Sequence, residues 1–227
     1  SPGVRAFRHL RFMTKASIIS AAFVLPMLAM VCWLLYSNYQ STMQERMDAT
    51  RQHVEIAHGI LVSAQAQESA GQLTRPQAQQ LALQLIEKLR YDKNEYFWIN
   101  DMQPQVVMHP FKPELNGKDA AHIKDPNGLA LFVVFTNVVR QSGQGFVTYQ
   151  WPRPGSDVAL DKLSYVKGFA PWGWVIGSGI YVDDVQDTFV RQAGWMGLGL
   201  LVSLSIASYM FLSFYRVMDG GLRETRR

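Results

Sequence analysis

Residues 162–181, KLSYVKGFAPWGWVIGSGIY, predict a β-hairpin around which the rest of the chain can be arranged. Two runs rich in Val, Ile, Tyr, Phe and Trp are joined by a short segment, residues 170–173, that contains Pro and Gly. β-Branched and aromatic runs separated by such a segment are typical of paired strands. We therefore expect strands over residues 162–169 and 174–181.

The first strand of this hairpin has an unusual face. Alternation places Tyr165, Lys167 and Phe169 on the same side of the strand. A lysine between two aromatic residues is uncommon in a strand that only fills a core. This face is therefore a candidate binding surface.

Two uncharged apolar runs stand near the ends of the chain, with 21 residues at 16–36 and 22 residues at 194–215. Each run is long enough to cross a hydrocarbon core of roughly 30 Å. Buried core helices are the alternative, which two such runs near opposite ends disfavour. The first run is also too long for the apolar region of a signal peptide, and no A-x-A-like site follows it. We expect an uncleaved anchor and a second membrane span.

The charges predict the orientation of these spans. Arginine and lysine accumulate outside them, before the first (Arg5, Arg8, Arg11, Lys15) and after the second (Arg216, Arg223, Arg226, Arg227). Basic flanks mark the cytoplasmic side, so both termini, residues 1–15 and 216–227, are expected in the cytoplasm. Residues 37–193 then form a domain on the outer side of the membrane.

The expected outer domain is slightly acidic, because residues 37–193 hold 14 Lys/Arg and 16 Asp/Glu, a net charge of −2. This balance argues against nucleic acid as a partner. The single cysteine, Cys32, excludes an intrachain disulfide.

A long amphipathic helix is expected after the first span. Apolar or small residues recur at spacings of three and four through residues 37–72 (Met43, Met47, Thr50, Val54, Ala57, Leu61, Ala64). Span and stripe could form one helix of about 55 residues, roughly 80 Å long. Such a stripe suits packing against a twin helix in a parallel homodimer. A stripe buried wholly within its own domain is the alternative.

The remaining patterns predict an α+β domain. Thr74 is a suitable cap for a second helix that extends to about Arg90. Alternating apolar residues predict strands over 95–101, 105–109 and 145–151 besides the hairpin. Asp125-Pro126 favours the start of a helix that ends near Arg140. With the hairpin this makes about five antiparallel strands and one inserted helix.

The motifs YFWIND, MHP, PELNGKD, KDPNG, GFVTYQWP, KLSYVKGF and PWGWVIGSGIYVDDV occur in this order over residues 37–190. This series resembles single Cache domains of the second type, the PAS-like periplasmic sensors of bacterial chemoreceptors and some sensor kinases. Anchor, domain and span together resemble a methyl-accepting chemotaxis protein, and MDGGLRETRR looks like the start of its cytoplasmic linker. The resemblance implies a PAS-like sheet, cytoplasmic signalling partners, and ligands such as acetate, propionate, pyruvate or lactate. It also implies a multi-pass protein of the bacterial inner membrane, with residues 37–193 in the periplasm.

Chemistry for a small carboxylate is present among the residues of these motifs. A buried carboxylate requires a cation and hydrogen-bond donors. We expect Lys167 to supply the charge, with Lys162, expected to face solvent, as the reserve cation. The other candidates are hydroxyl donors, a possible imidazole donor and two ring walls: Tyr165, Tyr149, Tyr96, His109, Trp98 and Trp151.

Each of these residues also has a purely structural interpretation. Tyr149 and Trp151 would then only pack the sheet, and His109 would only cap a strand end. Lys167 would be a solvated lysine of an exposed strand.

The sequence matches none of the catalytic or metal-binding motifs that we compared with it. His53 and His58 are five residues apart and do not share a helix face, and Gly177-Ser178-Gly179 lacks the spacing of a nucleophile elbow. We therefore expect no catalytic residue, metal or cofactor. Three functions remain: a ligand-binding chemoreceptor or sensor kinase, a module that reads a periplasmic binding protein, and a structural membrane anchor.

Overall fold

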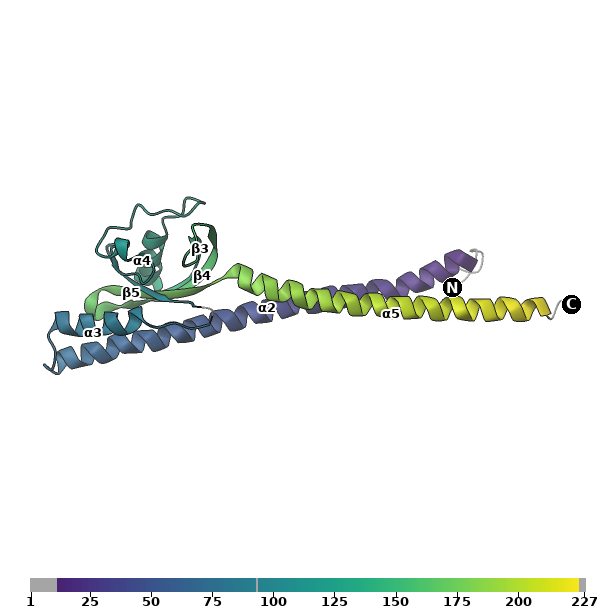
Figure 1. The fold of residues 1–227 in the computed structure, drawn as a ribbon, viewed down its shortest axis with the longest axis horizontal. Helices are drawn as coiled ribbons and strands as arrows, with labels where there is room; N and C mark the ends of the chain where they lie inside the picture. Colours follow the sequence, from purple (N-terminus) through teal and green to yellow (C-terminus); the bar gives the residue numbers. More distant parts are fainter. Residues whose placement is uncertain (1–11, 93, 225–227) are drawn as a thin grey trace. The chain divides into compact units, whose positions relative to one another are not determined.

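The computed structural model describes residues 12–92 and 94–224. Most of the expected N-terminal segment 1–15 and the last residues of the expected linker therefore lie outside the described residues. The chain forms two compact units. Gln40–Val185 holds the sheet and the helices packed on it, and Ser1–Tyr39 with Gln186–Arg227 forms the other unit (Figure 1).

Two long helices dominate the secondary structure. Helix α2 spans Phe12–Ser69 without interruption, so the predicted continuity of apolar run and stripe is confirmed. Helix α5 spans Val182–Glu224. Both contain stretches long and apolar enough to cross a membrane, by length and composition. The exact spans, 16–36 and 194–215, stay predictions.

Helix α3, Arg75–Glu87, begins where the sequence predicts, after Thr74. The Thr74 side chain accepts from the backbone N–H of Gln77, and the Gln77 side chain accepts from the N–H of Thr74. This reciprocal capping box satisfies two of the N–H groups that a helix start leaves unpaired.

The sheet has five antiparallel strands in the order β2-β1-β5-β4-β3, as predicted. The strands are β1 Phe97–Asp101, β2 Val106–Met108, β3 Gln144–Pro152, β4 Ala159–Phe169 and β5 Trp174–Tyr181. The 3-10 turn Ala170–Trp172 and Gly173 join β4 to β5, and Gly173 has a φ of +64° that favours glycine. The resulting register pairs Phe169 with Trp174 and Lys162 with Tyr181.

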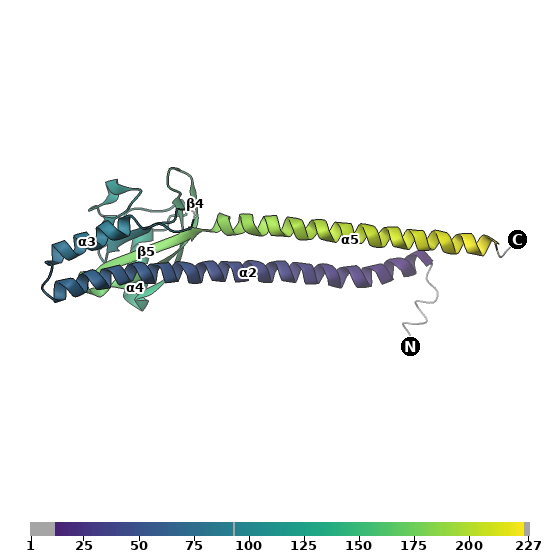
Figure 2. The same cartoon turned by 60° about the horizontal axis from the view of Figure 1, so that its bottom comes forward.

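Each face of the sheet is covered by different elements (Figure 1; Figure 2). On one face, buried residues of α2 and α3 pack against strand residues that include Phe97, Ile99 and Ile176. On the other face lie α4, Leu131–Ser142, and strand residues that include Trp98, Val147 and Tyr149. We call these the α2 face and the α4 face.

The predicted start of α4 is wrong. The helix begins at Leu131, and Asp125 instead closes a turn before it. The Asp125 carboxylate accepts from the backbone N–H groups of Asn127, Leu129 and Gln150 at 2.9–3.0 Å. Aspartate favours such local turns as strongly as helix starts, and the bond to Gln150 also ties the turn to β3.

Close packing between β5 and β4 generates a first prediction. An added Cβ at Gly179 would lie 2.0 Å from Ser164 Oγ and 2.5 Å from the carbonyl oxygen of Leu163. Because backbone cannot move aside easily, Gly179→Ala should destabilise the domain by about 1–3 kcal/mol or more and lower its melting temperature.

Gly59 is the matched control, since it lies in α2 with nothing within 4 Å of an added Cβ. At a protein concentration where the domain is monomeric, Gly59→Ala should raise the melting temperature, because alanine is favoured in a helix by about 0.5–1 kcal/mol. Equal melting temperatures for wild type and Gly179→Ala would contradict the packing described.

Candidate functional site

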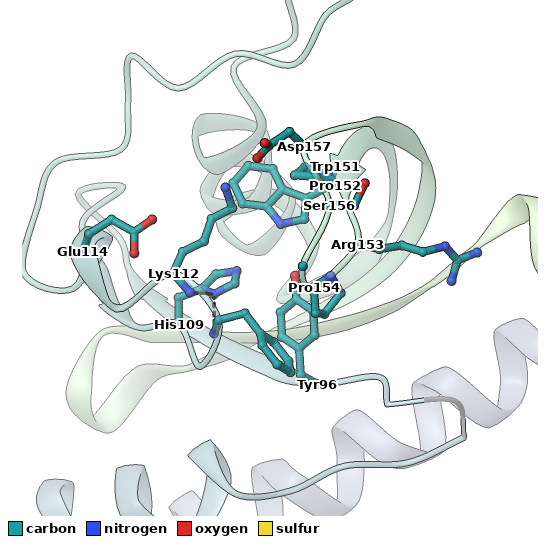
Figure 3. Close-up of a pocket in the computed structure, with 12 residues that line it drawn as sticks. Tyr96, His109, Lys112, Glu114, Trp151, Pro152, Arg153, Pro154, Ser156 and Asp157 are labelled. Atoms are coloured by element: carbon teal, nitrogen blue, oxygen red, sulfur yellow. Dashed lines mark hydrogen bonds between the residues drawn. The ribbon is translucent and has the colours of Figure 1, made fainter.

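A pocket of about 230 Å³ opens on the α4 face of the sheet (Figure 3). Its walls come from the residue before β1, from the loop after β2 and from the turn between β3 and β4. The lining residues are Tyr96, His109, Phe111, Lys112, Glu114, Trp151 and the turn residues 152–157. Three of the predicted site residues, Tyr96, His109 and Trp151, therefore meet at one cavity.

Lys162 is buried beside the pocket wall. Its side chain is 0% exposed, and its Nζ has no hydrogen-bond partner in the part of the chain that the structure describes. Aromatic rings surround the ammonium, with centroids at 4.3 Å for Tyr96, 4.8 Å for Tyr181 and 5.9 Å for Trp98. Ring faces attract a cation but donate no lone pair, so they offset its desolvation only in part.

The expectation that Lys162 faces solvent is wrong. Strand β4 begins at Ala159 rather than at Lys162, which places the lysine inside the strand. Its neighbours across the sheet are Tyr149 in β3 and Tyr181 in β5, so both sides are covered.

Glu95 is a second buried charge near Lys162. Its side chain is nearly inaccessible, and its Oε2 lacks a hydrogen-bond partner among the described residues. Burial raises the pKa of Glu95, and the charge of Lys162 opposes this rise. Burial likewise lowers the pKa of Lys162, against the charge of Glu95. The charge of each group therefore offsets only part of the cost of burying the other.

His109 is held as a neutral imidazole with a defined tautomer. Its Nδ1 accepts from the backbone N–H groups of Phe111 and Lys112, at 3.3 and 3.0 Å. Burial, together with the charges of Lys162 and Lys112, lowers the pKa of His109 to about 3. Because Nδ1 is an acceptor, the ring proton resides on Nε2, which makes His109 a hydrogen-bond donor. The histidine therefore orders its own loop and also offers a donor.

Tyrosine hydroxyls lie along the same face. The hydroxyl of Tyr149 and Oγ of Ser164 are 2.9 Å apart, and Tyr181 donates to the carbonyl oxygen of Pro152 at 2.8 Å. Burial raises the pKa of Tyr96, Tyr149 and Tyr181. These phenols therefore remain protonated and can act as donors at neutral pH.

The two predicted tryptophans take different positions. Trp151 lines the pocket, with its ring centroid 5.9 Å from that of His109. Trp98 lies deeper, where its Nε1 donates to Oδ1 of Asn100 and its ring packs on Phe135.

Lys167 and Tyr165 lie on the opposite face, so the structure does not bring them to the pocket. Lys167 pairs with Glu55 of α2. Tyr165 packs against Phe146 within the core of the α2 face. Residues 162 and 167 are separated by an odd number of positions, which in a strand places them on opposite faces.

The sequence interpretation missed several residues around the lysine. Tyr181 could have been found, because a four-residue connection in the 162–181 hairpin pairs it with Lys162. Ser164 could have been found as well, because it lies two positions after Lys162 in the same strand and therefore on the same face. Nothing in the local sequence marks Glu95 as buried. The role of Arg153, which follows the strand motif, likewise depends on contacts with a distant segment.

Known proteins resemble this chain over the sensor region. The profile described as Single Cache domain 2 matches residues 42–195. The methyl-accepting chemotaxis protein McpP of Pseudomonas putida is 45% identical over 166 residues, which are 72% of this chain and 30% of McpP. The chain therefore spans less than a third of the length of that relative.

Solved structures agree with this assignment. A structure described as the periplasmic sensor domain of a chemotaxis protein superposes with a TM-score of 0.61 and 46% identity, over 62% of this chain and 97% of that one. A second, described as the structural basis for carboxylic acid recognition by a Cache chemosensory domain, has a TM-score of 0.61 and 46% identity over 63% and 97%. With the profile covering most of its length, this chain belongs to the single Cache domain 2 family.

Proposed function

We propose that this chain is the sensor part of a chemoreceptor whose periplasmic domain binds a monocarboxylate of two or three carbons at Lys162. The observation that carries the proposal is the buried Nζ of Lys162, which lacks a hydrogen-bond partner among the described residues. A related solved structure is described as recognising carboxylic acids. A carboxylate is the ligand that would offset the desolvation of such an ammonium.

The surrounding residues favour a small ligand. Lys162 offers ammonium donors, and Nε2–H of His109 and the hydroxyl of Tyr96 are further donors near the same wall. The rings of Trp98, Tyr96 and Tyr181 occupy the space around Nζ, which leaves little room for a long or branched tail. Lys167, the cation first expected, is assigned no role in binding.

Membrane insertion and signal output complete the proposal. Residues 16–36 and 194–215 are the spans, both termini are cytoplasmic, and residues 37–193 are periplasmic. The signal passes along α5, which begins at Val182 directly after the last residue of β5. Its recipients are cytoplasmic signalling proteins that act through a C-terminal part beyond this chain.

We further infer a parallel homodimer through the outer side of α2. The inner side of this helix is occupied by its own sheet and by α3. Ile56 and Val62 nevertheless remain 69% and 47% exposed, with Gly59 between them. Large aliphatic side chains separated by a small residue suit a helix of a second copy.

Substitution of the two lysines separates the candidate cations. Acetate or propionate at about a hundred times its dissociation constant should stabilise the wild type by roughly 2.7 kcal/mol and raise its melting temperature by several degrees. Lys162→Met keeps most of the stem but removes the charge, so affinity should fall tenfold to more than a hundredfold. Thermal shift and calorimetry measure both.

Lys167→Met is the matched control. It breaks a partly exposed ion pair with Glu55, which contributes about 0–1 kcal/mol, and should leave affinity unchanged. Loss of binding in Lys167→Met with binding intact in Lys162→Met would reverse the assignment. If no small carboxylate at millimolar concentration changes the melting temperature of the wild type or gives a calorimetric signal, direct sensing is refuted.

Binding should take up protons and weaken as the pH rises. Burial raises the pKa of Glu95 and lowers that of Lys162, which brings both toward neutrality. An anion beside them raises the pKa of both, so the bound state holds more protons than the free state. By linkage, affinity should fall as the pH rises through neutrality. Calorimetry in buffers of different ionisation enthalpy should detect the uptake, and constant or rising affinity would contradict it.

The dimer can be tested with single cysteines in a Cys32→Ala background. Ile56→Cys should form a disulfide-linked dimer in membranes, because the residue faces its symmetry mate across the proposed interface. Leu85→Cys in α3 is the control, since this leucine is 49% exposed but lies on another helix. Equal crosslinking at both positions, or none at Ile56→Cys, would exclude this interface.

A further inference from the structure

The turn between β3 and β4 contacts both the pocket and the first turn of α5. Its residues 152–157 line the pocket. The guanidinium of Arg153, however, points away from the other pocket side chains (Figure 3). Its Nη2 lies 2.7 Å from Oδ1 of Asp183, and its Nη1 lies 3.1 Å from Oδ2 of Asp184. Both aspartates belong to the first turn of α5.

Tyr181 adds a second connection between the same two segments. The Arg153 guanidinium lies 4.3 Å from the centroid of the Tyr181 ring, and the Tyr181 hydroxyl donates to the carbonyl oxygen of Pro152. The same ring lies 4.8 Å from Nζ of Lys162. The end of β5 is therefore in contact with the pocket turn and with the buried cation.

We propose that Arg153 is a positioning residue that couples the pocket to α5, by holding the pocket turn and the first turn of α5 together as one mechanical unit. A ligand that displaces the pocket turn then displaces the start of α5 as well. This inference rests on the proposed function, because it needs a ligand in the pocket.

The chemistry of the contact favours coupling over simple stabilisation. Arginine can bind two carboxylates and stack on a ring at the same time, because its donors lie in one plane. The ion pairs are partly exposed, at 30% for Arg153 and 42% for Asp183, so their contribution to the free energy of unfolding is small. The helix dipole favours both aspartates at the start of α5 even without Arg153. Removal of the guanidinium should thus leave the fold intact.

Hydrogen exchange of the whole chain in lipid nanodiscs tests the proposal, with sodium acetate and sodium propionate as probes. In the wild type, ligand should slow amide exchange both in the loop 109–116 and at the start of α5, residues 184–189. In Arg153→Gln, the loop should still be slowed while the slowing in α5 falls by at least half. Each variant is measured at a saturating concentration of the probe, determined for that variant by calorimetry, so that a change in affinity does not enter the comparison of the α5 response.

Two further variants frame this result. Arg75→Gln breaks an ion pair of similar length, with Glu68 at 2.7 Å, on the α2–α3 side and should behave as wild type. Arg153→Lys keeps the charge but loses the planar fork, so it should weaken the response of α5. It also provides the test if Arg153→Gln does not fold.

The outcomes separate the two proposals. A full α5 response in Arg153→Gln, or in a folded Arg153→Lys if the first variant fails, overturns the coupling role. A wild type that responds in the loop but not in α5 overturns it too, while ligand binding stands. A wild type that shows neither a thermal shift nor slowed exchange with either probe refutes the proposed function, and the coupling role falls with it.

Discussion

The burial of one ammonium group governs the α4 face of this domain. An uncompensated charge inside a protein costs several kcal/mol, and Nζ of Lys162 has only ring faces and the partial influence of Glu95 to offset it. His109 and the tyrosines beside it are neutral hydrogen-bond donors, because His109 carries its proton on Nε2 and the tyrosines keep theirs. In the free domain the charge of this ammonium is therefore only partly offset, which is the physical basis of the small-anion site proposed above.

Elements specified by local sequence could be predicted well. The 162–181 hairpin, the Thr74 cap and the continuous helix depend on alternation, turn residues and spacing within one segment, and the structure bears them out. The site could be predicted only in part. Alternation shows that Lys162 and Lys167 lie on opposite faces, but not which face receives α2. That choice is made by long-range packing, so a lysine flanked by aromatic residues drew attention to the α2 face, away from the pocket.

Polar residues with several available partners explain the remaining differences. Asp125 can begin a helix or close a turn, and the N–H of Gln150, distant in sequence, adds a partner that helps to hold the turn. Glu95 looks like an ordinary surface acid beside YFWIND, yet it is buried near Lys162, Arg153 and Asp184. In both cases the deciding partner is separated by more than twenty residues, beyond the reach of any local pattern.

The absence of a loop between β5 and α5 has a consequence for how such sensors are recombined. Because Val182 begins the helix directly after Tyr181, no loop can absorb a change in the number of residues at this junction. One inserted residue at this junction would rotate the rest of α5 by about 100° and advance it by about 1.5 Å. Chimeric receptors built on this domain must therefore keep the number of residues between β5 and α5 unchanged.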